Sequence, residues 1–365
     1  MAKRIIMAGG GTGGHIFPAI AIANAIKKID NSIDILFVGA RGKMEMEKVP
    51  QAGYKIEGLD IAGFNRSSLI KNIGLPLKLV KSFFQVRGIF NRFKPDAVIG
   101  VGGYSSFPVL RFAQARSIPS FIHESNSFAG KTNTMLGKKA TRVFVASDGM
   151  HQFFPAEKIL ITGNPVRPDI VNVATVSKAE ALQFFNLQPG KQTVLVVGGS
   201  LGARSINTAL AAGLDDLLAA GLQVIWQTGK VDADKWKAAA AGKSGVWVGD
   251  FITQMQQAYA AADIVISRSG AMAIAELCLV NKPVLFVPFP FAAEDHQTVN
   301  AANLVNKGAA LMVKDSEAGG KMVPTILSLA TDKEKQNELK KNMTGLGVTD
   351  ADKKVAEEVL KQIRA

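Results

Sequence analysis

The chain of 365 residues contains one cysteine, Cys278, and no long uncharged apolar run. A single cysteine excludes a disulfide framework and Cys-rich zinc or iron–sulfur sites, and it suits a reducing compartment such as the cytosol. The apolar runs fall short of the ~18 residues that a membrane-spanning helix needs, and the apolar stretch near Met1 is too brief for a signal peptide. We therefore expect a soluble or peripheral protein.

Histidine is also scarce, with four residues at positions 15, 123, 151 and 296. These positions do not have the spacing of a metal-ligand set. We therefore expect no metal and no other cofactor.

Acidic residues are few in the first half of the chain. Residues 1–165 carry 22 Lys and Arg against 10 Asp and Glu, whereas residues 166–365 carry 21 against 20. This asymmetry predicts that the first half faces an anionic partner, which could be phosphates, nucleic acid or a membrane surface.

The stretch Ile61–Pro95 has no Asp or Glu, and its Lys and Arg residues alternate with Leu, Ile and Phe. This pattern fits a segment on an anionic membrane surface, where apolar side chains enter the headgroup boundary and cations meet the lipid. An ordinary buried helix with extended Lys and Arg side chains is the alternative. Nucleic acid is not expected, because no known binding module is present.

Short β-rich runs alternate with helical patterns throughout, which predicts parallel sheets with helices on both faces. The break Gly163–Pro168 predicts a boundary between an N-terminal domain, 1–165, and a C-terminal domain, 166–345. Asp350–Ala365 predicts an amphipathic helix that could cover either domain. We thus expect an α/β protein of two Rossmann-like, doubly wound domains facing a cleft. The ten predicted strands are Arg4–Ala8, Ile35–Val38, Ala97–Val101, Ser120–His123, Val143–Val145, Val194–Val197, Gln223–Gln227, Gly245–Val248, Ile264–Ser267 and Pro283–Val287.

Each predicted domain has a glycine-rich loop between its first strand and the next helix. The first loop, 9–15, fits G-x-G-x-x-G and ends at His15, and such loops let backbone N–H groups approach an anion. An NADP-dependent oxidoreductase is thus one alternative, although Val38–Arg41 lacks the acidic residue that binds ribose in NAD enzymes. The second loop, 198–204, contains Ser200 and could hold a diphosphate.

Polar residues follow three further strands. Glu276 lies in the helix after Ser267–Gly270, and its carboxylate could accept both hydroxyls of a ribose, although a lone helical Glu is usually solvated. His123–Asn126 and Gly100–Ser106 follow two strands of the first domain, and such clusters are typical of a site. The alternative for the first of them is a buried histidine and a helix cap.

Six motifs together resemble the MurG family of N-acetylglucosaminyltransferases. The resemblance covers essentially the whole chain in order. It implies a GT-B fold whose last helix, about 346–365, packs back on the N-terminal domain. The motifs are Gly-Gly-Thr-Gly-Gly-His at 10–15, Gly-Gly-Tyr-Ser-Ser at 102–106, His-Glu-Ser-Asn at 123–126, Gly-Asn-Pro-Val-Arg at 163–167, Gly-Gly-Ser-Leu-Gly-Ala at 198–203 and Ser-Arg-Ser-Gly-Ala at 267–271.

The resemblance also implies the reaction and its location. N-acetylglucosamine would pass from UDP-N-acetylglucosamine to the 4-hydroxyl of a muramoyl peptide on undecaprenyl diphosphate, with inversion and without a metal. The enzyme would lie on the cytoplasmic face of the inner membrane. A UDP-N-acetylglucosamine epimerase of the same fold and a non-catalytic sugar-nucleotide-binding protein are the alternatives.

The family's site residues carry over position by position. Ile252 would hold uracil through its backbone, Glu276 the ribose, and Arg167 and Ser200 the diphosphate side; Gly102, Gly103, Tyr104 and Ser105 would lie on the acceptor side. The other donor-site residues implied are Thr12, Gly13, Gly14, Asn126, Ala271, Met272, Ala273, Ile274, Ala275 and Gln297. The family often has hydroxyl side chains where this chain has Met272–Ala275, so backbone amides would have to serve there.

Three residues are candidates for the catalytic chemistry. Inversion requires a base for the acceptor hydroxyl, and His15 is the best candidate because an imidazole titrates near neutrality and borders the glycine loop. The resemblance marks His123 and Glu124 as site residues too.

Overall fold

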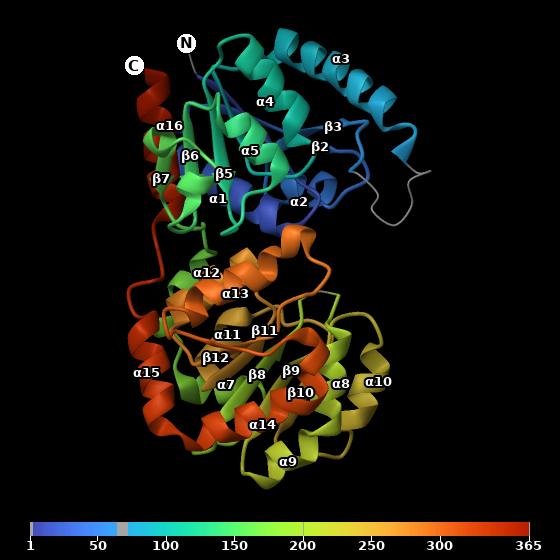
Figure 1. Cartoon of the computed structure of the whole chain (residues 1–365), viewed down its shortest axis with the longest axis vertical. Helices are drawn as coiled ribbons and strands as arrows, with labels where there is room; N and C mark the ends of the chain where they lie inside the picture. The colour runs from blue at the N-terminus through green and yellow to red at the C-terminus, as the bar shows by residue number, and fades with distance from the viewer. Residues whose placement is uncertain (1–2, 64–71, 200, 365) are drawn as a thin grey trace. The chain divides into compact units, whose positions relative to one another are not determined.

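The computed structural model describes residues 3–63, 72–199 and 201–364 and divides the chain into two compact units. Unit 1 comprises Met1–Val166 and Asp350–Ala365, and unit 2 comprises Arg167–Thr349. The predicted boundary, after residue 165, lies one residue before this division. Each unit has a parallel sheet flanked by helices (Figure 1).

The sheet of unit 1 has seven strands in the order β3-β2-β1-β4-β5-β6-β7, all parallel. Strand β1 lies inside the sheet and pairs with β2 on one side and with β4 on the other, so the carboxyl ends of the three strands meet at one edge. The strands are β1 (Arg4–Ala8), β2 (Asp34–Ala40), β3 (Lys55–Leu59), β4 (Ala97–Gly100), β5 (Ser120–Glu124), β6 (Arg142–Val145) and β7 (Ile159–Ile161).

Helices cover both faces of this sheet because successive strand residues point to opposite sides. Ile5 and Met7 of β1 pack into a core with α1 and α16, whereas Ile6 and Ala8 pack into a second core with α3, α4 and α5. The helices of unit 1 are α1 (Gly13–Ile29), α2 (Glu45–Gln51), α3 (Leu75–Phe93), α4 (Ser106–Ala115), α5 (Lys131–Gly137) and α16 (Ala351–Arg364).

Unit 2 repeats the architecture with six parallel strands in the order β10-β9-β8-β11-β12-β13. Its strands are β8 (Thr193–Val197), β9 (Gln223–Gln227), β10 (Val246–Gly249), β11 (Ile264–Ser267), β12 (Val284–Phe286) and β13 (Leu311–Met312). Its helices are α6 (Pro168–Val171), α7 (Lys178–Phe184), α8 (Arg204–Ala212), α9 (Leu214–Ala219), α10 (Ala233–Ala240), α11 (Met255–Ala261), α12 (Ala271–Val280), α13 (His296–Val305), α14 (Ala318–Thr331) and α15 (Lys333–Met343).

All ten predicted strands are present, with ends that differ by at most two residues. The prediction missed β3, β7 and β13, each of which lies at the edge of its sheet. An edge strand pairs on one side only and needs no continuous buried apolar run, so its sequence signal is weak. β7 and β13 are also only three and two residues long.

The C-terminal helix α16 belongs to unit 1. Val355, Ala356 and Val359 are fully buried against α1, and the Arg142 Nε donates to Glu358 Oε1 at 3.2 Å. In Figure 1 this red helix lies beside α1, at the other end of the chain. Within the described residues, no helix has both the length and the apolar character that crossing a bilayer requires.

Candidate active site

In unit 1, the loops after β1 and β4 touch through their backbones. The Gly10 N–H donates to the Gly102 carbonyl at 3.3 Å, and a Cβ atom at Gly103 would lie 2.4 Å from the Gly10 carbonyl oxygen. This contact joins the first glycine loop to the Gly102–Ser105 segment. Two predicted groups of site residues therefore lie together.

His15 lies in the first turn of α1, beside both loops. Its Nδ1 is 3.1 Å from the Gly10 carbonyl oxygen and 3.3 Å from the Thr12 hydroxyl, and a Cβ atom at Gly102 would be 2.9 Å from its Nε2. A carbonyl oxygen can only accept, so we assign the ring hydrogen to Nδ1. The lone pair of the neutral imidazole is then on Nε2, which can accept a proton.

His123, in contrast, is fully buried in β5. Its Nε2 is 3.5 Å from the Gly163 carbonyl and its Nδ1 is 3.4 Å from the Ser125 hydroxyl. Burial lowers the pKa of His123 to about 4, so the ring is neutral near pH 7. Its contacts fix the segment before Arg167 against β5.

Glu124 is also buried, and its carboxylate organises the loop that follows β5. Oε1 accepts the backbone N–H of Asn126 at 3.0 Å and its side-chain N–H at 3.3 Å. Oε2 accepts from the Gly130 N–H at 3.1 Å and from Asn133 Nδ2 at 2.9 Å. Glu124 thereby sets the position of Asn126, the residue expected to contact the transferred sugar.

The acceptor-side segment differs in exposure along its length. Tyr104 is partly exposed, and burial together with the negative charge of Glu45 raises the pKa of its hydroxyl, so it remains a donor. Ser105 is buried, and the neighbouring Ser106 hydroxyl donates to the Gly103 carbonyl at 2.7 Å. Of these side chains, Tyr104 is thus the one at the surface of the loop.

The sequence prediction missed Glu45, the first residue of α2. Its side chain is fully buried, and its carboxylate accepts the N–H groups of Gly11 at 2.9 Å and Ala40 at 3.0 Å. The signal in the sequence is weak, because Glu45 follows β2 but lies beyond the position where a dinucleotide-binding domain has its ribose-binding acid. In this chain the Glu45 carboxylate binds the glycine loop. This arrangement does not favour the oxidoreductase alternative.

In unit 2, Glu276 of α12 is held by two partners. The Arg167 Nε and Nη2 both donate to Glu276 Oε1, at 3.1 and 2.9 Å, and the Tyr259 hydroxyl donates to Oε2 at 3.0 Å. The Glu276 side chain is 11% exposed and that of Arg167 is 42% exposed. The residues predicted for ribose and for the diphosphate side are thus ion-paired with each other.

Tyr259 of α11 is a second residue that sequence reasoning missed. It is buried, and burial and the charge of Glu276 raise its pKa well above the usual 10, so its hydroxyl is a donor near neutral pH. Tyrosine in a short apolar helix is ordinary in a core, so the sequence offered no signal.

The start of α12 and Gln297 are the next predicted site residues in unit 2. The helix begins at Ala271, and its dipole places positive potential at this end. Ala271–Ala275 are all partly exposed. The Gln297 Oε1 accepts the Phe289 N–H at 3.0 Å and its carbonyl accepts from Ser269, so its side-chain N–H groups can turn to a ligand.

The backbone N–H of Ile252 is engaged within unit 2. It donates to Gln227 Oε1 at 3.0 Å, and Gln227 Nε2 donates to the Gly199 carbonyl at 3.2 Å. A ligand that used this N–H would have to displace Gln227. Ser200, in the neighbouring loop, lies outside the described residues.

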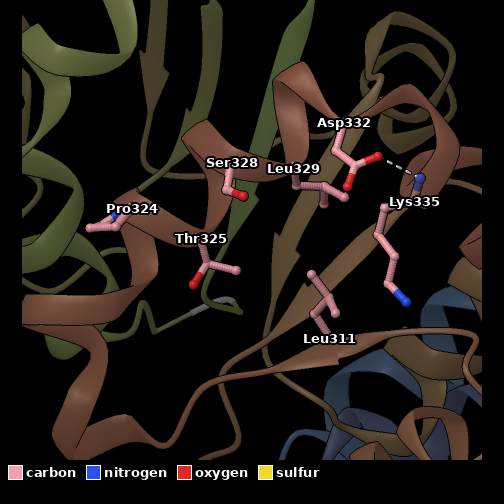
Figure 2. A pocket seen from close by; sticks show the side chains of 7 residues that line it. All are labelled: Leu311, Pro324, Thr325, Ser328, Leu329, Asp332 and Lys335. Atoms are coloured by element: carbon pink, nitrogen blue, oxygen red, sulfur yellow. Dashed lines mark hydrogen bonds between the residues drawn. The ribbon is translucent and has the colours of Figure 1, made fainter.

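A surface pocket of about 360 Å³ in unit 2 lies elsewhere (Figure 2). Its lining includes Leu311 of β13 and Asp332, which accepts the Lys335 N–H at 2.8 Å. Gln336 follows Lys335 in α15 and forms a hydrogen bond with Gln192, the residue before β8. The pocket therefore lies at the edge of the sheet where the strands begin. The predicted site residues follow the strand ends instead. Among the described residues, no group of three His, Cys, Asp or Glu side chains has a metal-binding arrangement.

The structure thus gathers the predicted residues into two sets. Unit 1 holds Thr12, Gly13, Gly14 and His15 against Gly102–Ser105, with His123, Glu124 and Asn126 at the end of β5. Unit 2 joins Arg167 to Glu276 and places the start of α12 near Gln297 through Ser269.

Comparison with known proteins identifies the family of both units. Residues 5–145 match the glycosyltransferase family 28 N-terminal domain, and residues 193–355 match its C-terminal domain. A protein of Parabacteroides distasonis is 52% identical over 99% of this chain and 98% of its own length. It is named UDP-N-acetylglucosamine–N-acetylmuramyl-(pentapeptide) pyrophosphoryl-undecaprenol N-acetylglucosamine transferase, as is a Flavobacterium psychrophilum protein that is 47% identical over 99% of this chain and 98% of its own length.

Solved structures agree with the sequence matches. The crystal structure of Acinetobacter baumannii MurG is 28% identical and covers 98% of this chain and 99% of its own, with a TM-score of 0.81. The UDP-GlcNAc 2-epimerase of Neisseria meningitidis shares the fold alone, at 14% identity and a TM-score of 0.67 over 99% of this chain and all of its own. The chain belongs to glycosyltransferase family 28 and, within it, to the MurG family, whose GT-B fold its two units have.

Proposed function

We propose that this protein transfers N-acetylglucosamine from UDP-N-acetylglucosamine to the 4-hydroxyl of the muramoyl peptide on undecaprenyl diphosphate, as a step of peptidoglycan synthesis. The observation that carries the proposal is identity of about half of all residues, over nearly the whole chain, with relatives named for this transfer. The epimerase alternative is not favoured, because the likeness to epimerases is one of fold.

Unit 2 is proposed to bind the donor. Glu276 accepts one ribose hydroxyl at Oε2, which keeps one lone pair beside the bond from Tyr259, and the second at Oε1 when Arg167 turns to the diphosphate. Backbone N–H groups at the start of α12 face the diphosphate, where the helix dipole favours negative charge. Gln297 holds the sugar. The backbone N–H of Ile252 binds uracil once Gln227 Oε1 no longer accepts it.

His15 is proposed as the base. The acceptor 4-hydroxyl loses its proton to Nε2 while its oxygen attacks the anomeric carbon, and the bond from that carbon to UDP breaks on the opposite side. One displacement inverts the configuration, and UDP leaves as an anion. The buried positions of His123 and Glu124 support a positioning role for both, His123 through Gly163 and Glu124 through Asn126.

The leaving group is proposed to need no metal ion. The start of α12 and the guanidinium of Arg167 supply positive potential for the departing diphosphate. Ser200, outside the described residues, remains a candidate donor from its sequence position.

A peripheral position on the cytoplasmic face of the inner membrane is proposed, with α3 and Ile73, two residues before this helix, as the contact. Ile73, Leu77, Val80 and Phe84 are 55–76% exposed, whereas Val86, Ile89 and Phe90 on the other side of the helix are buried. An exposed apolar stripe this long is unusual on a protein that meets only water. Residues 64–71 of the predicted membrane segment Ile61–Pro95 lie outside the described residues.

The structure reduces the number of cations that this helix offers to lipid. Lys81 pairs with Asp60 at 2.8 Å and Arg92 pairs with Glu57 at 2.7 Å, because β3 brings two carboxylates beside α3. Lys78 and Arg87 are exposed on the helix. The apolar stripe with these two cations is therefore the proposed contact with anionic lipid.

Transfer of labelled sugar to a short-chain lipid-diphosphate muramoyl peptide tests the proposal. The assay runs in EDTA, with UDP-galactose as the control donor. We expect a labelled disaccharide lipid from UDP-N-acetylglucosamine alone. Absence of transfer with the donor still bound would overturn the proposed reaction, and transfer that EDTA abolishes would overturn its metal independence.

A further inference from the structure

A buried carboxylate lies beneath the first glycine loop of unit 1. Glu45 has no exposed surface, and its two oxygens accept one backbone N–H each, from Gly11 at 2.9 Å and from Ala40 at 3.0 Å. Because a carboxylate without a proton accepts but does not donate, it matches two N–H donors.

The surrounding backbone is fitted to this side chain. A Cβ atom at Gly10 would lie 2.2 Å from Glu45 Oε1, and one at Gly39 would lie 2.5 Å from Glu45 Cγ. Glycine at both positions makes room for the carboxylate. Glu45 and the two glycines therefore form one packed group.

The contact with Gly11 continues to His15 through a single peptide group. The Gly11 N–H that Glu45 accepts and the Gly10 carbonyl that faces His15 Nδ1 belong to the same planar amide. Fixing the N–H on one side fixes the direction of the carbonyl on the other. A carboxylate on the N–H also polarises the amide and makes its carbonyl a stronger acceptor.

We propose that Glu45 is a positioning residue that acts on His15 through the Gly10–Gly11 peptide group. It holds the ring in the tautomer with the hydrogen on Nδ1, leaves Nε2 as the proton acceptor, and stabilises the imidazolium formed on proton transfer. A catalytic triad does the same with a carboxylate that touches the histidine directly. The catalytic part of this inference rests on the proposed function of His15.

Glu45→Gln is the first test, because the amide has one acceptor oxygen and would turn an N–H group toward one of the two backbone donors. We expect kcat to fall about 10- to 100-fold, which is part of the ~10²–10⁴-fold that a general base contributes. KM for UDP-N-acetylglucosamine should change less than about 3-fold, since Glu276 and Arg167, which are proposed to bind ribose and diphosphate, are in unit 2. The acidic limb of the kcat–pH profile should move to lower pH.

A double variant separates an effect through His15 from a general one. In the His15→Ala background, Glu45→Gln should cause little further loss of kcat, because the group through which it acts is absent. Independent losses that multiply in the double variant would overturn the proposal. Glu47→Gln is the matched control on the same helix, since Glu47 is exposed and pairs with Lys48; it should retain wild-type kcat.

The ring tautomer gives a readout that needs no activity. With ¹⁵N-labelled histidine, the chain has only four imidazoles, and His15→Ala assigns the signal. Wild type should have the hydrogen of His15 on Nδ1, and Glu45→Gln should shift the ring toward the Nε2–H tautomer. An unchanged tautomer would overturn the inference whatever happens to kcat, whereas an inactive wild type with this tautomer response would overturn only the proposed reaction.

Glu45→Asp covers the case in which Glu45→Gln does not fold. It keeps the charge on a side chain one methylene shorter, so we expect a kcat and tautomer population between those of wild type and Glu45→Gln. Folding of each variant is checked by its thermal unfolding. A folded Glu45→Asp with lower kcat, but with the wild-type pH profile and tautomer, would contradict a role through His15.

Discussion

At the residue scale, the proposed chemistry depends on which atom of His15 accepts a proton. The Gly10 carbonyl beside Nδ1 directs the lone pair to Nε2. His15→Ala should lower kcat ~10²–10⁴-fold, the usual contribution of a general base. Titration with UDP should give a Kd close to that of wild type, because Ile252 and Glu276, which are proposed to bind uracil and ribose, lie in unit 2. Near-normal turnover would exclude His15 as the base.

Tyr259 should determine how well Glu276 recognises ribose. Tyr259→Phe removes one hydrogen bond to a carboxylate, which is worth about 1.5–3 kcal/mol, and part of this should appear as a 3- to 10-fold higher KM for the donor. For the 2′-deoxyribose analogue of the donor, Tyr259→Phe should raise KM less, because this analogue makes fewer contacts with Glu276.

The control for this variant is Tyr54→Phe in unit 1, where the hydroxyl bonds Asn24 at 2.7 Å. Its KM for both donors should match wild type. Equal losses for the two donors in Tyr259→Phe would show that the hydroxyl supports folding and not ribose recognition.

His123 should make folding sensitive to acid. Its pKa is about 4 in the folded protein and about 6.5 when unfolded, so the unfolded chain binds the extra proton first. The resulting stability is complete above pH 6.5 and is lost as pH falls from 6.5 toward 4, by roughly 3 kcal/mol at most. Urea unfolding between pH 7 and 4.5 should show a flatter dependence in His123→Gln than in wild type. Parallel curves would contradict this account.

At the element scale, α3 combines a buried face with an exposed apolar one. Replacing Leu77 and Phe84 by Ser removes much of the stripe that is proposed to enter the lipid headgroups. Binding to vesicles of phosphatidylethanolamine with phosphatidylglycerol should weaken at least 10-fold in a sedimentation assay. Far-UV circular dichroism and UDP binding should stay as in wild type.

Val231→Ser is the matched control for α3, since Val231 is 56% exposed but lies in unit 2. It should bind vesicles as wild type does. If the α3 double variant bound vesicles as tightly as wild type does, the membrane contact would have to lie on another element.

At the scale of the whole molecule, much could be predicted from sequence because the signals are local. A buried parallel strand is a continuous apolar run, and a glycine loop follows it directly, so ten strands and two repeated domains were predictable. The six motifs also identified the family, because each is a short segment at the end of a strand.

Other features depend on residues that are distant in sequence. Arg167 and Glu276 are 109 positions apart, and their ion pair forms only because α6 and α12 pack together. Likewise, Asp60 and Glu57 neutralise two cations of a segment that has no acid of its own.

The sequence by itself determined the fold class, the order of the strands along the chain, the loops that carry the site and the family, because periodicity and motifs are written in neighbouring residues. The tertiary structure alone decided that Arg167 pairs with Glu276, that Glu45 reaches the glycine loop and that Tyr259 holds Glu276. The physical reason is that a buried polar group must find its partner wherever packing places one. That partner is a property of the fold and leaves no pattern in the sequence around it.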